Sequence, residues 1–210
     1  MLAEAGDAQL VFGGDVGWGP LPVETVDRIW SLGALALRGN ADRDLGDPWI
    51  EQQLGPERLV WLTTLPERLE LEIEGLGRVL FCHGSPRSDE EMLLRTASEE
   101  RLAEILAGVE ADVVICGHTH MQFDRVVGDK RVVNAGSVGL PYGATGAHWV
   151  ELGPDVQHRR MPYDPSPLRA SEWPRASEIV SVIESPPSEE DAIAEFEALI
   201  AAGRDATLIH

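Results

Sequence analysis

A buried strand that ends in a pair of histidines places the strongest constraint on this chain. The apolar run of residues 113–116 leads directly into Gly117, His118, Thr119 and His120. Alternate side chains of an extended segment point the same way, so His118 and His120 are expected to face one place. A His-x-His pair alone is a weak signal, and it gains weight here because other strands end in comparable residues.

Three further apolar runs are followed closely by a polar side chain: residues 9–12 by Asp15, residues 34–37 by Asn40, and residues 78–82 by His83. In layered α/β folds, binding sites form at the carboxyl ends of strands. Carboxylate, amide oxygen and imidazole are ligands that suit Mn, Fe, Zn or Ni. The sequence therefore predicts a metal site made from Asp15, Asn40, His83, His118 and His120.

The order of the predicted elements indicates the fold class. Strands are predicted at 9–12, 34–37, 68–74, 78–82, 113–116, 123–127, 131–133, 147–152 and 157–161, and helices at 22–32, 48–54, 56–62, 98–107, 173–184 and 188–202. Residues 1–6 are typical of the end of a helix. Strands that alternate with helices, followed by strands and then helices, favour an α/β protein with two sheets and helices outside.

The charge of the chain excludes some classes of partner. The net charge of −19 at 210 residues argues against a nucleic-acid platform or an anionic membrane surface, because both need basic clusters. An acidic protein can still bind a phosphate ester if metal cations supply positive charge locally.

The cysteines and the hydropathy indicate a compartment. Cys82 and Cys116 lie in apolar strand-like runs, which fits buried free thiols in a reducing environment. No apolar stretch approaches the roughly 20 residues that cross a bilayer, and no signal peptide opens the chain. We therefore expect a cytoplasmic protein.

Four sequence blocks together resemble a known family. They are Gly14-Asp15, Gly39-Asn40-Ala41-Asp42, His83-Gly84 and Gly117-His118-Thr119-His120, followed by Asn134-Ala135-Gly136-Ser137. This order is similar to the calcineurin-like metallophosphoesterases, and in particular to a small bacterial phosphodiesterase-like branch. The resemblance implies a two-sheet β-sandwich flanked by helices. It also implies a phosphoesterase domain over 1–165, with 166–210 as a helical extension packed on it.

The resemblance also implies a reaction. Asp15 would bridge two divalent metal ions, Mn being the expected metal and Fe, Zn or Ni the alternatives. Asn40, His83 and His118 would complete one ion's site, and His120 would bind the other ion. A hydroxide held by both ions would attack phosphorus in line, with Asp15, Asn40 and His83 as the catalytic residues.

The sequence defines the phosphate-binding residues and the substrate less closely. Gly14, Arg38 and Asp42 are candidates for phosphate contacts, and for each of them a turn or a loop-orienting role is the alternative. The substrate would be a small phosphodiester, a phosphomonoester or a phosphoprotein, and a homo-oligomer is compatible with the sequence.

Two features depart from the family pattern. The family begins with a strand that ends in Asp-x-His, and this chain has no such block before Asp15. In the family both residues serve the ion that His120 would bind, so this chain keeps one site nearly whole and lacks two ligands of the other. Our hypothesis is that the chain starts about twenty residues late, the length of a strand plus a helix, from a misplaced start codon or an internal start. An in-frame stop codon directly upstream would contradict it. Ala41 also stands where many members have a proton-donating histidine, and His148 is an unassigned substitute.

These departures leave a second class of function open. Without the first block, activity of the chain as written is expected to be impaired. A non-catalytic scaffold with the same fold is the alternative, and measured metal content would separate the two.

Overall fold

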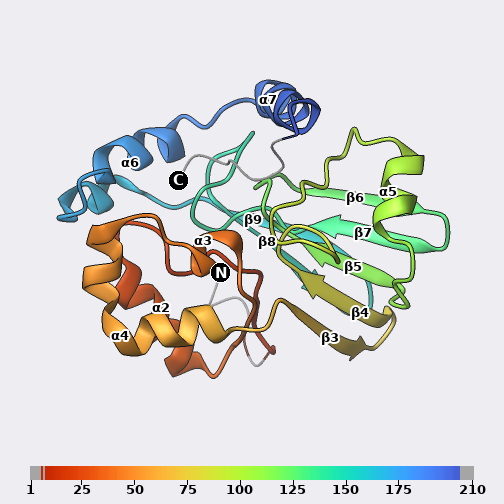
Figure 1. The fold of residues 1–210 in the computed structure, drawn as a ribbon, viewed down its shortest axis with the longest axis horizontal. Helices are drawn as coiled ribbons and strands as arrows, with labels where there is room; N and C mark the ends of the chain where they lie inside the picture. The colour runs from red at the N-terminus through yellow and green to blue at the C-terminus, as the bar shows by residue number, and fades with distance from the viewer. Residues whose placement is uncertain (1–5, 7, 204–210) are drawn as a thin grey trace.

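A computed structural model describes residue 6 and residues 8–203, and its strands form two facing layers (Figure 1). The larger layer is one sheet of strand order β3-β4-β5-β7-β6. Its strands are β3 (Arg68–Ile73), β4 (Gly77–Cys82), β5 (Val113–Cys116), β6 (Phe123–Val127) and β7 (Lys130–Asn134). The three central strands, β4, β5 and β7, run parallel, whereas β3 and β6 are antiparallel strands at the edges.

The second layer consists of two separate strand pairs. β1 (Val11–Phe12) pairs in parallel with β2 (Leu35–Ala36), and β8 (Ala147–Leu152) forms a hairpin with β9 (Val156–Met161). Within the described residues these pairs are not hydrogen-bonded to each other. Both pack on one face of the large sheet, where Val79, Phe81, Val113, Ile115 and Val133 meet Val11, Leu37, Val150 and Val156.

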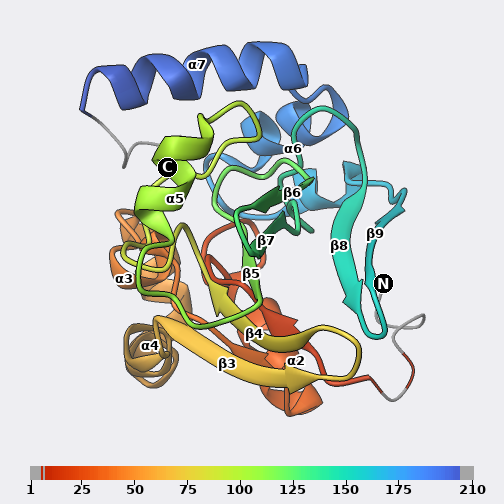
Figure 2. The same ribbon diagram turned by 90° about the vertical axis from the view of Figure 1, so that its right-hand side faces the viewer.

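Helices cover the outer face of the large sheet and that of the β1–β2 pair. α2 (Pro22–Leu32), α4 (Pro48–Thr64) and α6 (Ala176–Glu184) share an apolar cluster with β1 and β2. α5 (Glu99–Ile105) covers the other face of the large sheet. α7 (Glu189–Ala201) lies across the end of the molecule above α5 and α6 (Figure 2). This arrangement confirms the predicted α/β fold with sheets between helices.

Most element predictions agree with the structure to within two residues. The two helices predicted at 48–54 and 56–62 are confirmed, because the backbone of α4 is interrupted at Gly55, where φ is 65° and ψ is 173°. The main difference is at residue 173, where a helix start is predicted. The helix α6 begins only at Ala176, after a short 3₁₀ turn, η1 (Ser166–Ala170). The predicted helix end at residues 1–6 lies largely outside the described part. None of the described helices is long and apolar enough to cross a membrane.

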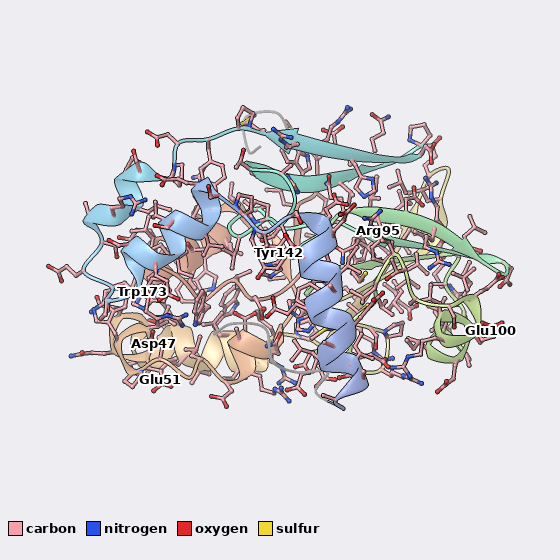
Figure 3. The ribbon with its side chains drawn as sticks, turned by 90° about the horizontal axis from the view of Figure 1, so that it is seen from above. Asp47, Glu51, Arg95, Glu100, Tyr142 and Trp173 are labelled. Carbon is pink, nitrogen blue, oxygen red and sulfur yellow. The ribbon has the colours of Figure 1, made fainter. Side chains whose placement is uncertain are left out.

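Trp173 connects the segment after residue 165 to the start of α4. It is 2% exposed, and its Nε1 donates to Asp47 Oδ2 at 2.8 Å (Figure 3). The other oxygen of Asp47 caps α4 by accepting from the N–H of Trp49 at 2.9 Å. Trp18 packs edge-on against Trp173, with ring centroids 4.9 Å apart. A single indole thus joins the segment after residue 165 to a helix N-terminus far earlier in the chain.

We expect Trp173→Ala to lower the free energy of unfolding by about 3–5 kcal/mol, because it leaves a large cavity. Trp173→Phe should cost less, since it removes chiefly the hydrogen bond to Asp47 and leaves that carboxylate a partner short, at about 1–3 kcal/mol. Urea unfolding monitored by circular dichroism measures both. The control Trp30→Phe, at a tryptophan 36% exposed, should change stability by under about 1 kcal/mol. Equal effects at the two tryptophans would contradict the anchoring role.

Candidate metal centre

The predicted ligands lie just beyond the carboxyl ends of four strands. Asn40 is there the first residue of a short helix that the sequence did not predict, α3 (Asn40–Arg43). His83 and His118 follow β4 and β5, which are parallel neighbours in the large sheet. Asp15 and Asn40 follow β1 and β2, which are parallel neighbours in the second layer. Where the two layers meet, the ligand atoms of Asp15, His83 and His118 all lie within 4.8 Å of one another. The structure therefore brings together side chains that the sequence spreads over a hundred positions.

His83 is held in one tautomer by its surroundings. Its Nδ1 lies 2.7 Å from the carbonyl of Gly13, which can only accept a hydrogen bond, so the proton is assigned to Nδ1. Its Nε2 lies 3.1 Å from Asp15 Oδ2 and 3.1 Å from Asn40 Oδ1. Three potential ligand atoms therefore converge, and either a proton on Nε2 or a cation must occupy the space between them.

The charge of Asp15 governs the protonation of His83. Burial opposes a charged ring, but the carboxylate of Asp15 and its hydrogen bond outweigh burial and raise the pKa of His83 to about 9. A cation would replace that proton and leave His83 neutral, as a ligand must be.

His118 is the most costly side chain to bury at this site. It is 2% exposed, and neither ring nitrogen has a hydrogen-bond partner among the described residues. Burial, and then the nearby His83, lower the pKa of His118 to about 3. A buried, neutral and unsatisfied imidazole is unfavourable unless another group uses its lone pair. The donor set and this ring together fit a divalent cation.

The backbone supports the same assignment. In the described part of the chain, three residues other than glycine have a positive φ: Asp15 at 57°, His118 at 61° and His120 at 59°. The left-handed region is uncommon for residues other than glycine, although Asp and His adopt it more often than most, and such backbone gathers at functional sites. All three are predicted ligands, so the fold holds strained backbone where the ligands are needed.

Asp42 organises the loops without being available to a ligand. Its Oδ1 accepts from the N–H groups of Val16 and Gly17, both at 2.9 Å. Its Oδ2 accepts from the backbone N–H of Asp15 at 2.6 Å and from the backbone N–H of Gly39 at 3.0 Å. Burial and the charge of Asp15 raise the pKa of Asp42 to about 6, although the backbone donors oppose this. This geometry favours the loop-orienting role over a phosphate contact.

Two glycines allow the loops to approach closely. A Cβ on Gly39 would lie 2.0 Å from Asp15 Oδ1, and a Cβ on Gly14 would lie 2.6 Å from His83 Nδ1. The N–H of Ala41 donates to Asp15 Oδ1 at 2.9 Å. Sequence analysis missed the contributions of Ala41 and of the Gly13 carbonyl, because any residue type supplies a backbone group.

The remaining candidates lie around this group. Arg38 donates to the carbonyl of Thr63 at 3.1 Å and pairs with Glu67, which ties it to the end of α4. His120 falls outside the 4.8 Å group and packs against Tyr142. His148 is 5% exposed, and its side chain lies next to Gly136. Burial lowers the pKa of its imidazole.

A family model now identifies the chain. The calcineurin-like phosphoesterase superfamily domain matches residues 2–152, which hold every predicted ligand. The chain belongs to this superfamily. It is thus a metal-dependent phosphoesterase, a hydrolase of phosphoester bonds.

Solved structures share the fold of this phosphoesterase. PH1004, a hypothetical protein from Pyrococcus horikoshii OT3, aligns with a TM-score of 0.72 and 20% identity over 87% of each chain. A metallophosphoesterase from Sphaerobacter thermophilus aligns with a TM-score of 0.69 and 23% identity over 88% of this chain and 91% of its own. At these identities the likeness shows the fold alone. A search of curated proteins finds no match.

Gly39→Ala is expected to weaken metal binding by the phosphoesterase, because its Cβ would displace Asp15. We expect at least about a tenfold loss of Mn²⁺ affinity, comparable to the loss of an outer-shell contact. Isothermal titration calorimetry measures it. Gly13→Ala is the matched control, since a Cβ there meets nothing within 4 Å. Equal affinities of the two variants would contradict the close packing of these loops.

The metal-free protein should lose stability as the pH rises. Because the folded pKa of His83, about 9, exceeds its ordinary value of 6.5, the stabilisation is complete below pH 6.5 and is lost as the pH rises through 9. The expected loss is about 3 kcal/mol, at about 1.4 kcal/mol for each pKa unit.

Urea unfolding of the chelator-treated protein between about pH 6 and pH 10 measures this loss. Saturating Mn²⁺ should abolish it, since the cation replaces the proton on His83. His83→Gln should remove the slope. An unchanged slope in that variant would assign the titration to another group.

Proposed function

We propose that this phosphoesterase binds two divalent cations, with manganese as the expected metal. Asp15, Asn40, His83 and His118 would hold one ion, and His120 with the shared Asp15 would hold the other. The observation that carries the proposal is the left-handed backbone at Asp15, His118 and His120. Such strain has a cost, and ligand binding at all three residues accounts for it.

Each ligand is prepared by contacts within the chain. The N–H of Ala41 fixes one oxygen of Asp15, which leaves the other to face His83. The carbonyl of Gly13 holds the proton of His83 on Nδ1 and so directs Nε2 toward Asn40. These contacts place the donors before any ion arrives, which lowers the cost of reorganisation during the reaction.

The cations would supply the positive charge that the acidic chain lacks. When bound, they would lower the pKa of a water for in-line attack on phosphorus and neutralise charge on the phosphate oxygens. The N–H of Gly14, beside the ligand loop, stays our candidate for a phosphate contact, and so does Arg38. No side chain is assigned as general acid, because Ala41 is apolar and His148 is neutral and buried.

The substrate class is a phosphodiester or a phosphomonoester, carried by a small molecule or by a phosphoprotein. A cytoplasmic location, a homo-oligomer and a domain limit at residue 165 stay predictions.

Hydrolysis of bis(p-nitrophenyl) phosphate and p-nitrophenyl phosphate with Mn²⁺ tests the function. His118→Ala and Asp15→Asn should each lower kcat/KM by at least about 100-fold, because they remove ligands directly. His158→Gln is the matched control and should retain activity, since it lies on β9 and Gln preserves a donor toward the Asn134 carbonyl.

Metal content provides the independent measurement. We expect the purified protein, after dialysis against Mn²⁺, to hold close to two ions for each chain. Failure to bind a stoichiometric transition metal, together with absent hydrolysis, would favour the non-catalytic scaffold instead.

A further inference from the structure

The C-terminal helix α7 reaches the candidate metal centre through two aromatic rings. We propose that Tyr142 and Phe196 position His120, so that α7 is a structural part of the site. α7 lies beyond residues 2–152, which match the family. The inference rests on the proposed function only in taking His120 as a metal ligand.

Tyr142 contacts both the side chain and the backbone of His120. The two rings are tilted by 43°, with centroids 5.3 Å apart. The backbone N–H of Tyr142 also donates to the carbonyl of His120 at 3.3 Å. Because His120 has a φ of 59°, its loop needs external contacts to retain this conformation. Tyr142 supplies two of them.

Phe196 packs against Tyr142 in turn. The centroids of these two rings are 6.0 Å apart, and Phe196 is 2% exposed. Both belong to a buried cluster that includes Met121, the residue after His120, and Ile193 of α7. Aromatic rings at such separations attract each other beyond their burial alone. Two ring contacts, from Phe196 to Tyr142 and from Tyr142 to His120, therefore connect α7 to the ligand.

Polar contacts fix α7 in the position that these ring contacts require. The N–H of Gly143, next to Tyr142, donates to the carbonyl of Pro187 at 2.9 Å, just before the helix. Arg95 pairs with Glu189 at 3.3 Å, and Thr96 donates to Glu197 at 2.7 Å. Figure 3 shows Tyr142 and Arg95 beside α7. Contacts at both ends of the helix keep Phe196 against Tyr142.

In metal sites generally, neighbouring residues that do not bind the ion hold the ligand side chains in position. Partners that orient a ligand typically change metal affinity about 10–100-fold when they are removed. Here the support for the imidazole ring of His120 is an aromatic ring, and the hydrogen bond from Tyr142 goes to the backbone of His120. The expected result of its loss is a His120 that samples other orientations, while the site around His83 and His118 stays as it is.

Calorimetric titration with Mn²⁺ tests the proposal. Phe196→Ala and Tyr142→Leu should weaken the second ion by about tenfold and leave the first unchanged. Tyr142→Phe, which keeps the ring, should bind both ions like the parent protein. Ile179→Ala in α6 is the matched control, because Ile179 is buried in a separate cluster. A similar weakening by Ile179→Ala would overturn the proposal, since general destabilisation would then explain it.

Hydrogen exchange of the metal-free protein gives a readout that needs no ion. Phe196→Ala should raise amide exchange in the segment 118–122 more than in β4, and Ile179→Ala should not. Unchanged exchange in that segment would overturn the positioning role.

His120→Ala separates the two proposals. If it leaves Mn²⁺ binding intact, the proposed two-ion site fails. If it removes the second ion while Phe196→Ala and Tyr142→Leu have no effect, the positioning role alone fails.

Discussion

The carboxylate of Asp42 is the contact on which the geometry of the centre depends. It accepts hydrogen bonds from the backbone of Asp15, Val16, Gly17 and Gly39, and so ties the loop after β1 to the loop after β2. Four donors satisfy a buried charge that would otherwise be unfavourable. Both ligand-bearing loops of the second layer are therefore ordered by a residue that has no oxygen left for an ion.

The position of the ligands was predictable because strand ends are visible in the sequence. Taken alone, Asp15 is typical of a turn and His83 of a buried structural histidine. The agreement of several strand ends, in the order of one family, is what predicts a site at a sheet edge. The alternation of residues 68–74 likewise predicts a half-buried strand, and β3 shows alternating exposed and partly buried residues. Helices and strands with a strong hydrophobic periodicity and a clear boundary residue were predicted to within two residues of their observed ends.

Other features leave no trace in residue type. The Gly13 carbonyl and the Ala41 N–H shape the ligands, yet every residue offers such groups. The contact of Tyr142 with Phe196 joins a loop to a distant helix. Helical spacing places Phe196 on the apolar face of that helix, but it does not identify the loop that this face meets. Tertiary packing decides each of these cases.

The ligands come from both layers of the sandwich, and this has a consequence for the life of the protein in the cell. Asp15 follows a strand of the second layer and His83 follows a strand of the large sheet. One ion bound by both side chains would therefore hold the two layers together. Ion release and separation of the layers are then thermodynamically linked. The amount of folded protein, and its survival against proteases, would follow the supply of transition metal, so that scarcity lowers abundance as well as turnover.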